Sequence, residues 1–136
     1  RFSSGTWLRS FQTNESASGS YVVYNLFMNS FYAKDRKEWR DWLEENHYKE
    51  PEIWLIKYHK SSSTPSVSYE DAVEEALCFG WIDSLHRSRD KESSIQKFSP
   101  RKPKSNWAES NRIRVRRLIA KGLMTKAGRK TLPKDL

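Results

Sequence analysis

The pattern of apolar and polar positions is clearest over residues 68–83, where it predicts a helix that leads directly into a strand. Ser68 has the properties of an N-cap, and Asp71, three residues later, those of its capping-box partner. Apolar residues then recur at helical spacing, and Gly80 stands where a glycine in the left-handed conformation ends a helix. The residues from Trp81 onward are predicted to be extended.

Other parts of the chain show the same two periodicities. An amphipathic helix is predicted from Asp35, because Asp35 is a suitable N-cap and Glu38 lies at capping-box spacing. Trp39 and Trp42 fall on one face of that helix. Residues 52–59 have β-branched and aromatic residues on both faces, which is typical of a strand near the centre of a sheet.

The C-terminal half predicts a hairpin followed by helices. Extended segments at residues 81–88 and 94–99 are separated by a polar turn. Ser105 is the expected cap of a helix over residues 106–121, and Thr125 is the expected cap of a further short helix. We therefore predict an α+β fold with a small, mainly antiparallel sheet packed against three to four helices. The strand, helix and strand within residues 52–88 are also compatible with a right-handed crossover.

The first 27 residues differ from the rest, since they are rich in Ser, Asn and Gly and lack the periodicity that follows. We interpret residues 1–27 as a flexible or non-native extension and residues 28–136 as one α+β domain. The chain of 136 residues suffices for one such domain. The last predicted helix is unfinished at Leu136, so we expect the domain to be truncated at its C-terminus.

The net charge of +8 is concentrated in the C-terminal third of the chain. Residues 97–130 contain twelve Lys and Arg but one acidic residue, Glu109. Clustered cations attract polyanions, so a nucleic acid or an anionic membrane surface is the expected partner, with a protein partner also open. The alternative is a solvated basic helix face with no partner. The residues of the candidate polyanion surface are Lys102, Lys104, Arg112, Arg116, Arg117 and Lys121.

The sequence contains no recognised catalytic, metal-binding or cofactor-binding motif, so it predicts no catalytic residue, no metal and no cofactor. Cys78 is the single cysteine, and it precedes a predicted helix C-terminus, whose dipole raises the pKa of a thiol. We expect it to be an unreactive core residue. One cysteine forms no internal disulfide, which favours a cytoplasmic location.

Strand alternation over residues 81–88 places Trp81, Asp83 and Arg87 on one face of the predicted hairpin. Two indoles and two guanidinium groups are suited to binding a planar or anionic ligand. The opposing interpretation is structural, with the tryptophans in the core and Asp83 paired with Arg101 as a clamp between strand and loop. The candidate ligand-binding residues are Trp81, Asp83, Arg87, Arg101, Ser105, Trp107 and Asn111.

Five motifs carry a family resemblance over about residues 31–136. They are Ala76-Leu77-Cys78-Phe79-Gly80-Trp81-Ile82-Asp83, Phe98-Ser99-Pro100-Arg101, Ser105-Asn106-Trp107, Asn111 and Gly122-Leu123-Met124-Thr125-Lys126-Ala127-Gly128. In order and spacing they resemble the YdeI/OmpD-associated (bacteriocin-protection) family. The resemblance implies a small bacterial or archaeal protein linked to resistance against antimicrobial peptides, with no established reaction.

The leading hypothesis is therefore a non-enzymatic binding protein of this kind. It would engage an anionic partner through the basic C-terminal helix and the cluster of Trp and Arg residues. The alternative hypothesis is an enzyme or a small-ligand-binding domain centred on Asp83, for which the sequence names no reaction.

Overall fold

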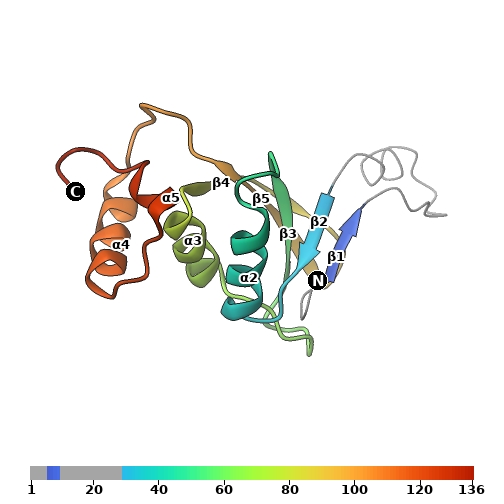
Figure 1. Ribbon diagram of the computed structural model, residues 1–136. Coiled ribbons are helices and arrows are strands. Elements are labelled where there is room, and N and C mark those ends of the chain that lie inside the picture. Colours follow the sequence, from blue (N-terminus) through green and yellow to red (C-terminus); the bar gives the residue numbers. More distant parts are fainter. Residues whose placement is uncertain (1–5, 10–28) are drawn as a thin grey trace.

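The structure, a computed structural model, describes the backbone of residues 6–9 and the whole of residues 29–136 (Figure 1). The N-terminal extension predicted over residues 1–27 therefore lies mostly outside the described residues. Its described part, Thr6–Arg9, forms strand β1 and pairs antiparallel with strand β2 (Asn29–Tyr32).

A five-stranded mixed sheet forms one layer of the fold, with the strand order β1-β2-β3-β5-β4. Its other strands are β2 (Asn29–Tyr32), β3 (Ile53–Tyr58), β4 (Trp81–Ser88) and β5 (Ser93–Pro100). Strands β2 and β3 are parallel, and the remaining neighbours are antiparallel. This confirms the predicted α+β class with a mainly antiparallel sheet. Helix α2 (Arg36–Asn46) joins the parallel pair. Strands β3 and β4 are also parallel to each other, because both pair antiparallel with β5, and helix α3 (Tyr69–Cys78) connects them as the sequence allowed.

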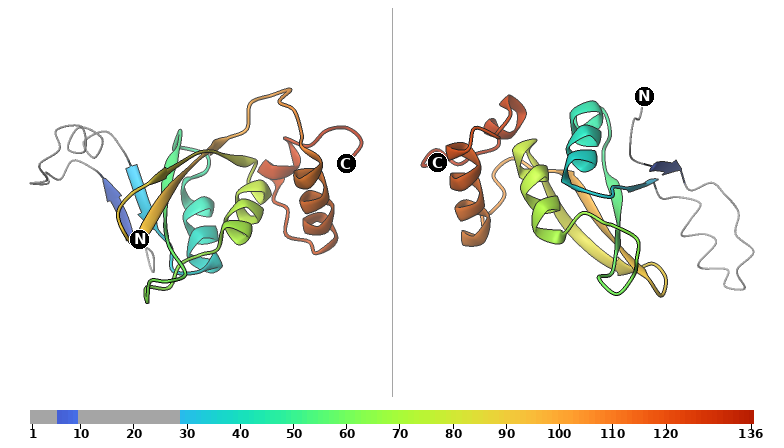
Figure 2. Two further views of the ribbon diagram at one scale, coloured as in Figure 1. Left: turned by 180° about the vertical axis from the view of Figure 1, so that it is seen from behind. Right: turned by 90° about the horizontal axis from the view of Figure 1, so that it is seen from below.

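The helices lie side by side in the order α2, α3, α4 (Figures 1 and 2). Helices α2 (Arg36–Asn46) and α3 (Tyr69–Cys78) cover one face of the sheet. Helix α4 (Glu109–Ala120) and the short helix α5 (Lys126–Arg129) flank α3 on the side away from α2. Helix α3 therefore packs between helices on both sides, and its polar face is covered as well as its apolar face.

The predicted starts of helices α2 and α3 are confirmed. The Asp35 carboxylate accepts a hydrogen bond from the Glu38 amide at 3.0 Å, and the Ser68 hydroxyl accepts one from the Asp71 amide at 3.2 Å. Each bond satisfies a backbone donor that has no partner within its helix. Gly80 has φ +78°, which ends α3 in the left-handed conformation and turns the chain into β4.

The predicted start of α4 is wrong. The helix begins at Glu109, after Ala108, and has no side-chain cap, while Ser105 is exposed. The amide of Ser105 instead donates to the Lys102 carbonyl at 3.3 Å, closing a turn in which Pro103 precedes Lys104, whose φ is +63°. Proline followed by a residue of positive φ is typical of a type II turn. This turn therefore delays the helix and leaves residues 101–108 as a loop.

The main core lies between the sheet and helices α2 and α3. Trp39 and Trp42 are stacked with ring centroids 5.6 Å apart, and Trp42 meets the edge of Trp81 at 5.8 Å. Phe98 of β5 contacts Trp39 from the sheet at 5.1 Å. Aromatic side chains thus fill much of this core. A smaller cluster on the opposite face of the sheet contains Trp54, Ile56 and Ile95.

The C-terminal segment docks onto the end of α3 by close backbone approach. The Thr125 amide and hydroxyl both donate to the Cys78 carbonyl, at 3.0 and 2.6 Å. A Cβ atom at Gly128 would overlap the same carbonyl, and one at Gly80 would lie 2.8 Å from the Thr131 methyl. The glycines of two sequence motifs therefore have a structural role, because they let α5 approach the end of α3.

Candidate functional site

Strand β4 does not keep the expected alternation. Its register against β5 shifts between Asp83 and His86, which is a β-bulge. Asp83 lies opposite Phe98 on the helix-covered face, whereas Arg87 lies opposite Ile95 on the other face. The prediction that Arg87 shares a face with Trp81 and Asp83 is therefore wrong, because the bulge changes the side on which every later residue of the strand lies.

Arg87 is instead associated with the smaller cluster behind the sheet. Its guanidinium carbon lies 5.9 Å from the ring centroid of Trp54. Trp81 is 1% exposed and belongs to the main core, where its indole N–H donates to the His47 carbonyl at 3.3 Å. Among the seven candidate ligand-binding residues, Arg87 is thus separated from the others by the sheet, and Trp81 is separated from them by its burial in the main core.

Asp83 does not form the expected clamp with Arg101. One oxygen of its carboxylate, Oδ2, accepts hydrogen bonds from Gln96 Nε2 at 2.8 Å and from the Tyr69 hydroxyl at 3.3 Å. No ion pair joins Asp83 to Arg101, and both residues are among those described. The clamp prediction is wrong because the Asp83 carboxylate is directed at Gln96 and at Tyr69 in the first turn of α3, while the Arg101 guanidinium lies against Trp107.

Arg101 lies against Trp107 in the loop over residues 101–108. Its guanidinium carbon is 3.9 Å from the centroid of the Trp107 ring, and Nη2 donates to the Asn106 carbonyl at 2.8 Å. Its Nε–H is buried and has no hydrogen-bond partner in the described part of the chain. Burial lowers the pKa of the Arg101 guanidinium, which is still a cation at neutral pH. Arg101 is thus a partly desolvated cation without a carboxylate.

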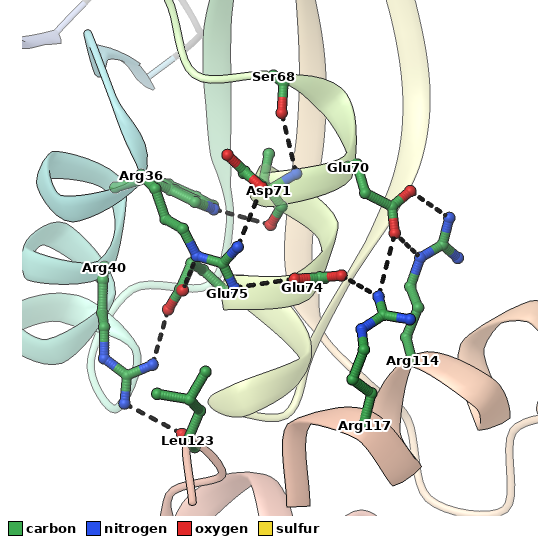
Figure 3. Close-up of polar contacts among 12 residues, drawn as sticks. Arg36, Arg40, Ser68, Glu70, Asp71, Glu74, Glu75, Arg114, Arg117 and Leu123 are labelled. Carbon is green, nitrogen blue, oxygen red and sulfur yellow. Dashed lines mark hydrogen bonds and ion pairs between the residues drawn. The ribbon is translucent and has the colours of Figure 1, made fainter. Parts of the chain in front are cut away.

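The arginines of α4 differ from Arg101, because each forms an ion pair within the protein. Arg114 donates twice to the Glu70 carboxylate, at 2.8 and 2.9 Å, and Arg117 pairs with Glu74 (Figure 3). Arg112 pairs with Asp135, and Arg116 lies 3.8 Å from Glu109. Asn111 accepts a hydrogen bond from Arg114 at 2.8 Å. Arg112 and Arg117 thus contact other parts of the protein, whereas Asn111 and Arg116 contact residues of α4 itself.

Two of these acidic partners, Glu70 and Glu74, belong to a network centred on α3. Arg36 of α2 binds Asp71 at 3.0 Å, Glu74 at 2.9 Å and also Glu75 (Figure 3). Arg40 binds Glu75 at 2.7 Å and the Leu123 carbonyl at 3.1 Å. Although burial by itself lowers the pKa of Arg36, its hydrogen bonds to Glu75 and Glu74 hold that pKa above its usual value. The network thus joins α2, α3 and α4.

Most of the remaining cations of the C-terminal third belong to two segments that contact Gly80. The Arg101 amide donates to the Gly80 carbonyl at 2.9 Å, and α5 packs on the same glycine. Loop 101–108 and α5 therefore meet at this point. We name the cations of the two segments the basic corner: Arg101, Lys102, Lys104, Lys126, Arg129 and Lys130. All of these except Arg101 are exposed, and none has a carboxylate partner within residues 29–136. Lys121 is exposed as well but lies at the C-terminal end of α4.

Three residues that the sequence did not single out surround Asp83. Gln96 and Tyr69 bind its carboxylate, and Lys57 Nζ lies 4.9 Å from the centroid of the Tyr69 ring. Burial lowers the pKa of Lys57, while burial and the charge of Asp83 raise the pKa of Tyr69. The sequence did contain a signal for Lys57. It stands two residues after Leu55, and this spacing places the lysine on the buried face of a strand.

Cys78 agrees with its prediction, because it is fully buried and burial raises the pKa of its thiol to about 11. Within the described ranges, no group of three or more His, Cys, Asp and Glu is arranged to hold a metal ion. The helices described here include none long and apolar enough to cross a membrane.

Comparison with known proteins gives one match. Residues 31–131 match the family model described as "Domain of unknown function (DUF8412)". No curated protein and no solved structure matches the chain.

Proposed function

Since the chain belongs to the family described as Domain of unknown function (DUF8412), we propose a function from the geometry of the molecule itself. The protein is a non-enzymatic binding protein that engages the phosphate groups of a nucleic acid through the basic corner. The proposal also places it beside the YdeI/OmpD-associated (bacteriocin-protection) family that its motifs resemble, and in the cytoplasm.

The observation that carries this proposal is the unpaired state of Arg101. Elsewhere in the helical layer, arginines such as Arg36, Arg40 and Arg114 are bound to carboxylates. Arg101 is held in place by Trp107 and Asn106, yet no carboxylate of the described residues neutralises it. A guanidinium group offers planar donors that match a phosphate, and here its orientation is fixed before binding.

The composition of the surface favours a nucleic acid over a membrane. Binding to a lipid surface is strengthened by apolar side chains that enter the bilayer. The large exposed apolar residues of the described chain are Tyr48, Tyr69, Leu85 and Ile113. None of them belongs to loop 101–108 or to α5. A surface that offers lysines, an arginine and no exposed apolar anchor is suited to phosphates held in water.

The test is the affinity of the protein for a fluorescent single-stranded oligonucleotide as a function of salt concentration. We expect the logarithm of the association constant to fall linearly with the logarithm of salt concentration, by about 0.7 for each phosphate neutralised. Arg101→Gln should weaken binding. Arg116→Gln is the matched control, since it removes the same charge from an exposed arginine that pairs with Glu109; it should weaken binding less.

Three outcomes would overturn the proposal. These are the absence of salt-dependent binding to the oligonucleotide, equal effects of the two substitutions, and tighter binding to vesicles containing phosphatidylglycerol than to the oligonucleotide. The last result would identify an anionic membrane surface as the partner.

A further inference from the structure

Lys57 occupies an unusual position for a lysine. It follows Ile53 and Leu55 at alternate positions of β3, so it lies on the face of the sheet that the helices cover. It is half-buried, and Nζ lies over the ring of Tyr69, in the first turn of α3. Lys37 and Lys97 pair with carboxylates at 2.9 and 3.1 Å. Lys57, by contrast, has no carboxylate within 4.0 Å in the described part of the chain.

An acid–base pair lies beside this amine. The Tyr69 hydroxyl donates to Asp83 Oδ2, and Gln96 Nε2 donates to the same oxygen. Because the Gln96 amide nitrogen must face the carboxylate, its carbonyl oxygen points elsewhere, and that oxygen is buried without a partner among the described residues. Three strands and a helix thus bring an amine, a phenol, a carboxylate and an amide together.

We propose that Lys57 is a carbonyl-binding residue, at which a small aldehyde or ketone forms an imine with the amine while Tyr69 and Asp83 transfer the protons. An unpaired lysine amine beside a phenol and a carboxylate is the set of groups that this reaction needs. The inference is independent of the proposed nucleic-acid binding, since Lys57 is not part of the basic corner.

The proposed reaction balances without an oxidant or a reductant. The lone pair of neutral Lys57 Nζ attacks the carbonyl carbon, and the oxygen takes up a proton from the Tyr69 hydroxyl to give a carbinolamine. Asp83 accepts a proton from the nitrogen, and the hydroxyl group leaves as water after the Tyr69–Asp83 pair returns that proton to it. The iminium ion that forms then gives its remaining N–H proton to the Tyr69–Asp83 pair. The products are an imine and one water molecule, and the two side chains return to their starting states.

The environment of each group favours its role. Burial lowers the pKa of Lys57, which increases the fraction of the neutral nucleophile, although the charge of Asp83 acts in the opposite direction. Burial and Asp83 raise the pKa of Tyr69, although Arg114 lowers it, so the phenol keeps its proton at neutral pH and is available as a donor.

The experiment is competitive labelling of the unmodified protein. The protein is treated briefly with propionaldehyde and sodium cyanoborohydride, which reduces imines to stable amines, and the labelled lysines are identified by peptide mapping. Lys60 is the internal control, because it is exposed in the loop that follows the same strand. Positioned proton transfer typically contributes about 10²–10⁴-fold to a rate, so we expect Lys57 to be labelled at least about tenfold faster than Lys60.

Labelling of Lys57 at or below the rate of Lys60 would overturn the proposal, since that is the result expected for a lysine that is merely half-buried. A second variant tests the proton transfer. Tyr69→Phe keeps the ring over the amine but removes the hydroxyl group, so labelling of Lys57 should slow severalfold while that of Lys60 stays the same. An unchanged rate at Lys57 would remove Tyr69 from the reaction and overturn the proposed mechanism.

Discussion

Replacing Glu75 with glutamine tests whether the charge network on α3 stabilises the fold. The side chain of Glu75 is 3% exposed, and its two oxygens accept hydrogen bonds from different arginines of α2, Arg36 and Arg40. Glutamine has nearly the same shape but offers one acceptor, and it presents an amide N–H₂ group to the other guanidinium. The substitution therefore removes a charge and one charge-assisted hydrogen bond without creating a cavity.

The expected cost follows from what each arginine retains. Arg36 keeps Asp71 and Glu74, whereas Arg40 keeps the Leu123 carbonyl but has no second carboxylate among its described partners. Removing one partner of a fully buried pair costs about 3–5 kcal/mol. The side chains of Arg36 and Arg40 are 33% and 27% exposed, so hydration of the two guanidinium groups offsets part of this cost. We expect Glu75→Gln to lower the free energy of unfolding by about 2–3 kcal/mol.

Urea denaturation followed by tryptophan fluorescence measures this difference. The matched control is Asp41→Asn, the same carboxylate-to-amide change in the exposed pair with Lys37 on α2. An exposed pair of this spacing contributes about 0.3–0.5 kcal/mol. If both substitutions cost less than about 0.5 kcal/mol, the network does not stabilise the contact between α2 and α3, and our interpretation of it is refuted.

Three more predictions use the same measurement. The double-mutant cycle of Asp83→Asn and Arg101→Gln should give a coupling energy within about 0.5 kcal/mol of zero, because the two residues do not interact; strong coupling would restore the clamp. Hydrogen bonds from Arg114 hold the pKa of Glu70 below its usual value, so the Glu70 carboxylate stabilises the folded protein above about pH 4.3, and this stabilisation disappears as the pH falls through the folded-state pKa. Glu70→Gln should thus cost below about 1 kcal/mol at pH 7 and less at pH 3, and an equal cost at both would contradict this. Gly128→Ala should cost about 1–3 kcal/mol, since the methyl group overlaps a carbonyl of α3; a neutral effect would mean that α5 is not docked as described.

The sequence predicted the helices well because their signals are local. Ser68 with Asp71, and Asp35 with Glu38, form their cap bonds within four residues. Gly80 has the left-handed conformation that its place at the end of the helix indicated. The start of α4 was predicted incorrectly, because Ser105 is also suited to close a turn and the turn formed.

The sheet was predictable in class but not in register. Strand β2 is four residues long and shows no alternation that would distinguish it from a loop. The bulge in β4 arises from its pairing with β5, and the spacing of Asp83 and Arg87 in the sequence does not predict it. Since one inserted residue changes the face of every later side chain, the predicted row of site residues depended on a detail that local sequence does not encode.

The basic C-terminal third illustrates the limit of charge counting. The count correctly located the excess of Lys and Arg, but it treated every cation as available to a partner. When α4 packs on α3, Arg114 and Arg117 form ion pairs with Glu70 and Glu74, which lie more than forty residues away in the sequence. Only the tertiary structure distinguishes cations that pair with a carboxylate from those that do not. On this basis the candidate binding surface moves from α4 to the loop that contains Arg101.

Titration of the ¹⁵N-labelled protein with a single-stranded oligonucleotide is the most direct test of binding by the basic corner. The buried Nε–H of Arg101 has no hydrogen-bond partner in the described chain, and we expect it to give its own signal in a ¹H–¹⁵N correlation spectrum. We expect this signal to shift on titration, together with backbone amides of loop 101–108 and α5. Shifts confined to the exposed face of α4, or a spectrum that does not change, would contradict it.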